Sequence, residues 1–229
     1  MDFKSRFLTI DDKELKNTLI PNEQNWWSKT REYKFAIDNL KKNDIILDAG
    51  CGIEHPFKLI ASQKASKIIC LDKDKRILSL NESDNIEYNL YDLTKNSKEN
   101  NLIFSDEMFD KIFCLSVLEE IKPQSKILDI LKFFKQILKP DGYIVITCNY
   151  PFLLTEHFVN YVHGSELTFV SEADYTINKN VLKGPYNGLK CFTAILEKNN
   201  REKKIKKIKG IIKNNIDETN IENEIEEIK

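Results

Sequence analysis

The segment Ile45-Ile46-Leu47-Asp48-Ala49-Gly50-Cys51-Gly52 joins a short apolar run to a turn that contains two glycines. Glycine has no Cβ and tolerates positive φ, so this kind of turn lets the backbone come close to a ligand. Pro56 follows at a position typical of the first turn of a helix, whose free amide groups would face whatever lies on the turn. The segment therefore predicts a strand, a tight turn and a helix around a ligand site.

Similar apolar runs recur along the chain and alternate with helical or polar stretches. The predicted strands cover residues 45–48, 67–71, 85–90, 109–115 and 143–148. Helical spacing between the last two is kept by Ile127, Ile130, Leu131, Phe134 and Leu138, and Lys139-Pro140-Asp141-Gly142 should end that helix. This alternation predicts an α/β fold with a doubly wound, mainly parallel sheet covered by helices on both faces. The polar stretch 95–107 predicts a loop or a weak helix in place of a regular crossover.

The two ends of the chain differ from this middle part. Residues 1–44 are expected to form an N-terminal helical cap, because Tyr33, Ala36, Ile37 and Leu40 share one helical face, with a break at Pro21 and Asn22. Residues 45–198 form the main domain, where 168–176 and 189–197 predict two further strands. Residues 199–229 form a charged tail: seven basic groups and one acidic group up to 214, then one basic and six acidic. Its isoleucines suit an amphipathic helix or a self-complementary pair of helices, either solvated or in contact with a partner or RNA.

Composition limits the class of protein. The 35 basic and 36 acidic residues give a net charge of -1, which offers no broad field for nucleic acid or an anionic membrane. The five cysteines are odd in number and lie mostly in apolar runs, which indicates buried free thiols in a reducing cytosol. Three histidines and no CxxC pair argue against a metal site. With no apolar signal core and no run of 18 apolar residues, we expect a soluble, cytoplasmic protein without a membrane span.

Acidic residues follow three successive predicted strands. Asp72 comes 24 residues after Asp48 (72 - 48), the spacing at which α/β nucleotide sites place a carboxylate on the ribose hydroxyls. Asp92 follows the third run and is suited to accept a hydrogen bond from an adenine amino group. Aspartate is also a preferred helix cap, so a structural role stays open for each. Because ligands collect at the carboxyl ends of strands in such sheets, an adenosine-containing ligand is implied.

The motifs occur in an order that resembles class I S-adenosylmethionine-dependent methyltransferases, the small-molecule enzymes in particular. The resemblance covers about residues 30–150 and is carried by Ile46-Leu47-Asp48-Ala49-Gly50-Cys51-Gly52, Cys70-Leu71-Asp72, Phe109-Asp110-Lys111-Ile112, Ser116-Val117-Leu118-Glu119-Glu120-Ile121 and Leu138-Lys139-Pro140-Asp141-Gly142-Tyr143. It implies a seven-stranded sheet with the last strand antiparallel. It also implies that residues 45–198 bind S-adenosylmethionine through Asp48, Gly50, Cys51, Gly52, Asp72, Lys73, Asp92, Leu93 and Leu115.

Two positions depart from the family pattern. Glu54 stands where a third glycine is often found, so the turn into the helix must differ. Glu120 stands where the family often has a histidine. Methyl transfer asks little of acid and base groups, because the sulfonium already makes the methyl carbon electrophilic and in-line approach is the main task. The catalytic residues are therefore unknown, with Glu120, His157 and Tyr150 as candidates on the substrate side; a surface or core role is the alternative for His157.

These observations predict methyl transfer from S-adenosylmethionine to the oxygen, nitrogen or carbon of a small molecule. The acceptor pocket should involve the N-terminal helix, Glu119-Glu120 and residues 150–163. Nucleic acid is an unlikely partner, although an RNA methyltransferase that uses the basic stretch 203–213 is one alternative, and an inactive cofactor-binding protein is another. A dehydrogenase is disfavoured because the later glycine of its dinucleotide motif is absent. Trp26 and Trp27 either cover the cofactor or pack against helices.

Overall fold

The structure is a computed structural model that describes residues 3–16, 26–81, 83–185 and 188–199. The described residues up to Lys198 belong to one compact unit. Its centre is a nine-stranded sheet with the order β4-β3-β2-β5-β6-β9-β1-β8, in which β7 also pairs with β9. The strands are β1 (Ser5–Phe7), β2 (Ile45–Ala49), β3 (Lys67–Asp72), β4 (Ile86–Leu90), β5 (Phe109–Leu115), β6 (Leu138–Tyr150), β7 (Leu167–Phe169), β8 (Ala173–Asp174) and β9 (Lys190–Lys198).

The half of the sheet formed by the five strands predicted between residues 45 and 148 is parallel. Strand β2 lies between β3 and β5, and β4 and β6 extend the sheet on either side, all with parallel pairing. The inner strands consist almost entirely of buried residues, which is why their sequences are continuous apolar runs. The last strand, β9, pairs antiparallel with β6, as the family resemblance implies.

The sheet has nine strands instead of the expected seven. Residues 168–176, expected as one strand, contain the end of β7 and all of β8. The other addition is β1, which pairs antiparallel with β9 and parallel with β8. These strands are two or three residues long, too short to show an alternating pattern in the sequence.

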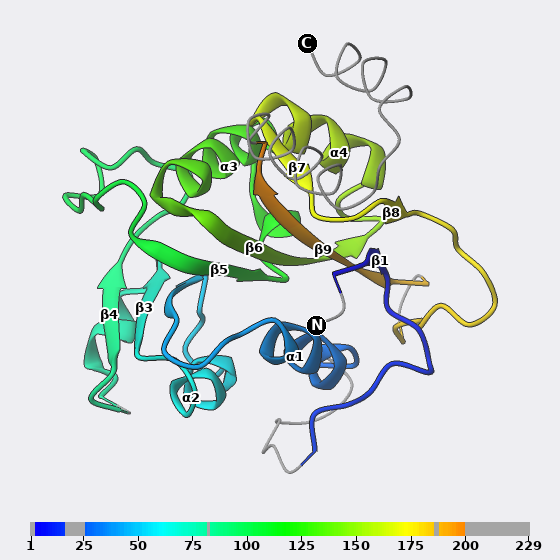
Figure 1. The fold of residues 1–229 in the computed structure, drawn as a ribbon, viewed down its shortest axis with the longest axis horizontal. Helices are drawn as coiled ribbons and strands as arrows, with labels where there is room; N and C mark the ends of the chain where they lie inside the picture. Colours follow the sequence, from blue (N-terminus) through cyan, green and yellow to red (C-terminus); the bar gives the residue numbers. More distant parts are fainter. Residues whose placement is uncertain (1–2, 17–25, 82, 186–187, 200–229) are drawn as a thin grey trace, which may run out of the picture. The chain divides into compact units, whose positions relative to one another are not determined.

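Helices cover both faces of the sheet (Figure 1). Helices α1 (Lys29–Asp38) and α2 (Phe57–Ser62) pack on one face, and α3 (Lys126–Ile137) and α4 (Thr155–Gly164) on the other. Two short 3-10 helices, η1 (Lys75–Ser79) and η2 (Leu118–Glu120), follow β3 and β5. Ile127, Ile130, Leu131 and Phe134 are buried, so the helical spacing in the sequence marks the face of α3 that contacts the sheet. The doubly wound α/β prediction is confirmed.

The expectation of a helical cap over residues 1–44 is wrong in part. Within the described residues of this range, the α-helix covers Lys29–Asp38, whereas Ser5–Phe7 is a strand of the main sheet. Arg6 and Phe7 pair with Thr193 and Phe192, so the N-terminal segment is held by residues far away in the sequence. The predicted break at Pro21 and Asn22, and the charged tail beyond Asn199, lie outside the described residues.

Several smaller predictions can also be compared with the structure. The stretch 95–107 contains no helix or strand, so of the two predicted forms it is the loop. Helix α3 ends at Ile137, but the chain re-enters the sheet at Leu138 at once, with a register shift between Phe109 and Lys111 opposite the proline and glycine. All five cysteines are free and buried. Among the described helices, none is long and apolar enough to cross a membrane.

Candidate functional site

A cavity of about 430 Å³ lies at the carboxyl edge of the parallel strands. Its size is that of a pocket for a small ligand. It is lined by residues that follow β2, β3, β4 and β5, namely Gly50, Asp72, Lys73, Tyr91, Asp92, Leu93, Thr94, Ser116, Val117, Glu120, Ile121 and Lys122. The sequence motifs on four separate strands therefore meet at one site, because parallel neighbours bring their carboxyl ends together.

The glycine turn has the conformation that the sequence predicts. Gly50 and Gly52 have φ of 77° and 59°, values that residues with a Cβ rarely adopt. The turn is fixed to β3 by hydrogen bonds from the backbone amides of Gly50 and Cys51 to the carbonyl of Leu71, at 2.8 and 3.0 Å. A Cβ on Gly50 would lie 2.6 Å from Val117, so the turn and the cavity wall touch at this residue.

A buried lysine holds the part of the turn in which the third glycine is missing. Lys58 on α2 is 1% exposed, and its ammonium donates to the carbonyls of Gly52, Ile53 and His55 at 3.0, 3.0 and 2.8 Å. Three carbonyls that point into the protein thus gain a charged partner, which makes stronger hydrogen bonds than a neutral one. Lys58 explains how the turn is stabilised with Glu54 in place of glycine.

His55 closes the outer side of the same turn. Its ring stacks on Trp26 with centroids 4.5 Å apart, and its Nδ1 lies 3.0 Å from the Tyr33 hydroxyl. Burial, and the charges of Lys29 and Lys58, lower the pKa of His55 to about 4, so the ring is neutral at pH 7. Trp26 therefore packs on the turn; neither tryptophan is among the residues that line the cavity.

The acids after β3 and β4 both line the cavity and both make local hydrogen bonds. Asp72 accepts from the amides of Gly52 and Asp74, at 2.9 and 3.0 Å, so it joins the glycine turn to the end of β3. Asp92 accepts from the amide and the hydroxyl of Thr94, at 3.0 and 2.7 Å. Neither acid is a helix N-cap, the structural role that the sequence left open, because Asp74 caps η1 and no described helix begins directly after Asp92. Both acids instead hold local turns and line the cavity.

Asp48 lies behind the turn, in the middle of these charges. It is 4% exposed, and within the described part of the chain no hydrogen bond or ion pair joins its carboxylate to another group. Burial raises the pKa of Asp48 to about 7; the charges of Lys58 and Lys29 oppose this, and that of Asp72 adds to it. Desolvation thus outweighs the two lysine charges at this carboxylate, which lies outside the cavity lining.

A second group of buried polar residues, which no sequence motif indicated, lies on the α1 side of the ends of β5 and β6. Glu32 on α1 is 0% exposed and accepts hydrogen bonds from Ser116, which lines the cavity, and from Thr147. Burial acts to raise the pKa of Glu32, but Lys29 and three hydroxyl donors hold it below its ordinary value. Glu32 is therefore a charged carboxylate one hydrogen bond away from the cavity wall.

Glu119 lies beside this group. It is 3% exposed and accepts from the backbone and side-chain amides of Asn149, at 3.1 and 2.7 Å. Its other oxygen, Oε2, and Oδ1 of Asn149 are buried without a hydrogen-bond partner. Burial raises the pKa of Glu119 to about 7, while Lys29 opposes the shift and Glu32 adds to it.

Some predicted site residues do not line the cavity. Asp48, Cys51 and Leu115 are buried and Gly52 is half-buried, and none of the four is part of the lining. Glu120 is an exposed lining residue, but the other two catalytic candidates lie elsewhere. Side chains alternate along β6, so Asn149 faces Glu119 whereas Tyr150 packs on Phe7 in the opposite layer. His157 is exposed on α4, which packs against α3.

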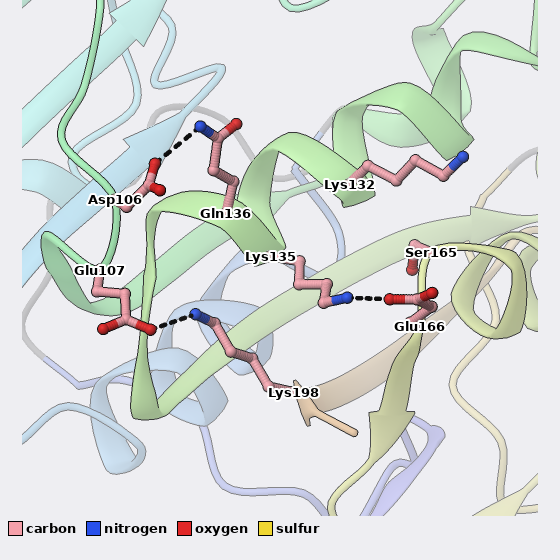
Figure 2. A pocket seen from close by; sticks show the side chains of 8 residues that line it. All are labelled: Asp106, Glu107, Lys132, Lys135, Gln136, Ser165, Glu166 and Lys198. Carbon is pink, nitrogen blue, oxygen red and sulfur yellow. Dashed lines mark hydrogen bonds and ion pairs between the residues drawn. The ribbon is translucent and has the colours of Figure 1, made fainter. Parts of the chain in front are cut away.

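A larger cavity, of about 610 Å³, lies between α3, the turn after α4 and the end of β9 (Figure 2). Its polar side chains pair with one another: Lys135 with Glu166 and Lys198 with Glu107 as ion pairs, and Gln136 with Asp106 by a hydrogen bond. Glu107 precedes β5 and Lys198 ends an antiparallel strand, which places this cavity at the amino-terminal edge of the parallel sheet. It contains none of the sequence motifs, so the smaller cavity is the functional candidate. No described group of three or more His, Cys, Asp or Glu side chains could hold a metal ion.

The comparisons with known proteins point to the same part of the chain. The model of a family described as a methyltransferase domain matches residues 47–146, which include the glycine turn and both acids. No curated protein matches the chain.

Solved structures share the fold. The N-methyltransferase NodS of Bradyrhizobium japonicum superposes with a TM-score of 0.57 at 14% identity, covering 78% of this chain and 100% of that one. A TehB-like S-adenosylmethionine-dependent methyltransferase of Corynebacterium glutamicum gives 0.54 at 17% identity, covering 76% and 92%. The cyclase SpnF gives 0.55 at 13% identity, covering 82% and 87%.

The residues present fit S-adenosylmethionine. The cavity lining combines two acids, which suit the hydroxyl and amino groups of adenosine, with the apolar side chains of Leu93, Val117 and Ile121, which suit the faces of the base. The chain therefore has the fold of class I methyltransferases, and its residues 47–146 match a methyltransferase domain, a match that implies S-adenosylmethionine as the methyl donor.

Proposed function

We propose that the chain transfers a methyl group from S-adenosylmethionine to a small-molecule acceptor. The observation that carries this proposal is the cavity at the carboxyl edge of the sheet, where the glycine turn and the acids after β3 and β4 form one wall. In this site Asp72 would hold the ribose, and Asp92 and Leu93 the adenine. The bound cofactor supplies an electrophilic methyl group, and the chain has to orient the two reactants and exclude water.

The charges around the cavity favour a small acceptor over nucleic acid. Its lining holds three acids (Asp72, Asp92, Glu120) and two lysines (Lys73, Lys122), a mixture that offers no track for phosphate groups. The RNA alternative depends on the basic stretch 203–213, which lies outside the described residues. The cyclase SpnF shares the fold, so a fold of this kind can carry a reaction other than methyl transfer.

An isotope-transfer experiment tests the acceptor class. The full chain, incubated with S-adenosylmethionine labelled in its methyl group, should label a component of a small-molecule extract and leave total RNA unlabelled. Label in RNA that disappears when residues 199–229 are removed would contradict the proposal and support the RNA alternative.

We predict that Asp72→Ala weakens binding of S-adenosylhomocysteine by about 1 to 3 kcal/mol, because charged hydrogen bonds to the ligand and to the turn are lost together. Titration calorimetry on the full chain measures the change. Asp74→Ala is a matched control, since Asp74 lies two residues away, pairs with Arg76 and does not line the cavity. Equal affinities in the two variants would exclude Asp72 from the site.

A further inference from the structure

The carboxylate of Glu32 connects three elements at the edge of the cavity. Oε1 accepts from the hydroxyl of Ser28 at 2.6 Å, just before α1. Oε2 accepts from the hydroxyl of Ser116, which follows β5, at 2.8 Å, from Thr147 on β6, and from the ammonium of Lys29 at 3.3 Å. The partners from β5 and β6 are 84 and 115 residues away in the sequence, so this one side chain fixes α1 against two strand ends.

Ser116 has a conformation that needs such support. Its φ is 56°, in the left-handed region that residues with a Cβ rarely adopt. Its amide donates to the carbonyl of Thr147 at 2.9 Å, and its hydroxyl donates to Glu32. Ser116 and its neighbour Val117 both line the cavity, and Val117 is the side chain that contacts Gly50. The shape of this wall therefore depends on where Ser116 is held.

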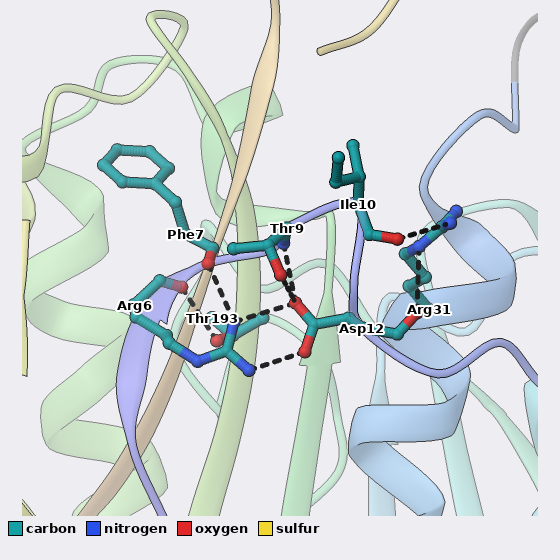
Figure 3. A network of polar contacts seen from close by, with 7 residues as sticks. All are labelled: Arg6, Phe7, Thr9, Ile10, Asp12, Arg31 and Thr193. Carbon is teal, nitrogen blue, oxygen red and sulfur yellow. Dashed lines mark hydrogen bonds and ion pairs between the residues drawn. The ribbon is translucent and has the colours of Figure 1, made fainter. Parts of the chain in front are cut away.

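The N-terminal segment fixes α1 in turn (Figure 3). Arg31, next to Glu32, donates to the carbonyls of Asp12 and Ile10 at 3.2 and 3.5 Å. Asp12 receives two hydrogen bonds from Arg6 on β1, at 2.8 and 2.6 Å, and the backbone of Arg6 accepts from Thr193 on β9. A continuous set of contacts thus runs from the far strands of the sheet through α1 to the cavity.

We infer that Glu32 is a positioning residue for the cofactor: it holds Ser116 and Thr147 together, so that the wall formed by Ser116 and Val117 keeps the shape that binds S-adenosylmethionine. Glu32 itself does not line the cavity. The N-terminal segment is by this account part of the cofactor site although it contributes no lining residue. The inference rests on the proposed function, since it concerns the same cavity.

Two substitutions at Glu32 distinguish the effect of its hydrogen bonds to Ser116 and Thr147 from the effect of its negative charge. Glu32→Ala removes every hydrogen bond to Ser116 and Thr147. In Glu32→Gln, the amide oxygen can still accept from both while the amide nitrogen donates to the Ser28 hydroxyl. We expect Glu32→Ala to weaken S-adenosylhomocysteine binding by about 10-fold or more and Glu32→Gln by less than about 3-fold, as measured by calorimetry on the full chain.

A third variant controls for the stability of α1. Asn39→Ala removes the hydrogen bond from the buried Asn39 amide to the Phe35 carbonyl. Asn39 lies at the C-terminal end of α1, opposite the end that holds Glu32. We expect this variant to lose stability in urea unfolding and to keep its affinity for S-adenosylhomocysteine. Loss of affinity in Asn39→Ala equal to that in Glu32→Ala would show that the helix acts only through overall stability and would overturn the inference.

The remaining outcomes are equally decisive. A folded Glu32→Ala variant with unchanged affinity overturns the inference, and so does a Glu32→Gln variant that loses as much affinity as Glu32→Ala. If Glu32→Ala does not fold, Ser116→Ala removes one arm of the bridge alone, and we expect about 3-fold weaker binding; unchanged affinity there also overturns it. Absence of binding by the unmodified chain contradicts the proposed function itself and is recognised before any variant is compared.

Discussion

Lys58→Met is expected to lower the free energy of unfolding by roughly 3 to 5 kcal/mol, because three buried carbonyls lose their donor and each unsatisfied group costs about 1 to 3 kcal/mol. The variant leaves the carbonyls of Gly52, Ile53 and His55 without their donor in a place where the lysine is 1% exposed. It also removes the positive charge that opposes the raised pKa of Asp48. Methionine fills a similar volume, so the effect comes from the lost ammonium and not from a cavity.

Urea unfolding and calorimetry with S-adenosylhomocysteine measure the two consequences of this substitution. The relaxed turn should bind the ligand at least about 10-fold more weakly, which corresponds to about 1.4 kcal/mol. Lys67→Met is the matched control, because Lys67 begins the neighbouring strand, is 47% exposed and makes a surface ion pair with Glu87; such a pair contributes less than about 1 kcal/mol. If Lys58→Met behaves like Lys67→Met in both measurements, Lys58 does not hold the turn.

Some strands could be predicted from the sequence and others could not, for a physical reason in each case. Strands β2 and β5 could be predicted because strands buried on both faces are continuous apolar runs. Strand β1 could not, because three residues carry no periodicity and its pairing with β9 spans most of the chain. The assignment of residues 1–44 to a separate helical cap failed for the same reason.

The residues of the cavity differ in the same way: contacts between neighbours in the sequence could be predicted, and contacts between distant residues could not. Gly50, Asp72 and Asp92 each follow a predicted strand, and parallel pairing alone brings strand ends together, so the sequence was sufficient to group them. Glu32 could not be assigned, because its partners lie 84 and 115 residues away and no spacing rule connects them. Lys58 is local, within six residues of its three carbonyls, but no general sequence pattern predicts a lysine that bonds the turn before its own helix.

We expect Glu119→Gln to stabilise the chain at alkaline pH, in contrast to most substitutions of buried polar residues. Two buried oxygens at this place have no hydrogen-bond partner: Oε2 of Glu119 and Oδ1 of Asn149. Buried polar groups of this kind destabilise a fold, and a charged one does so most. Glutamine keeps an oxygen for the amides of Asn149 and places a neutral NH₂ group where the unpaired carboxylate oxygen lies.

The direction of the pH effect follows from the raised pKa. Burial raises the pKa of Glu119 from 4.5 to about 7, so between these values the folded chain holds a proton that the unfolded chain has released. The free energy of unfolding contributed by this group therefore falls as the pH rises through that window and is constant above it. Glutamine does not titrate, so the stability of the variant relative to the unmodified chain should increase by on the order of 2 kcal/mol between pH 5 and pH 8.

Urea unfolding of both proteins at pH 5 and pH 8 tests this prediction, and the difference between them removes the contributions of other titrating groups such as Asp48 and His55. Glu120→Gln, at the exposed neighbouring position, should show no comparable change. A Glu119→Gln variant that is less stable by the same amount at both pH values would mean that its carboxylate is well solvated or paired. Loss of methyl transfer in the stabilised variant would show that the unpaired carboxylate takes part in the reaction, because functional sites often keep groups that destabilise the fold.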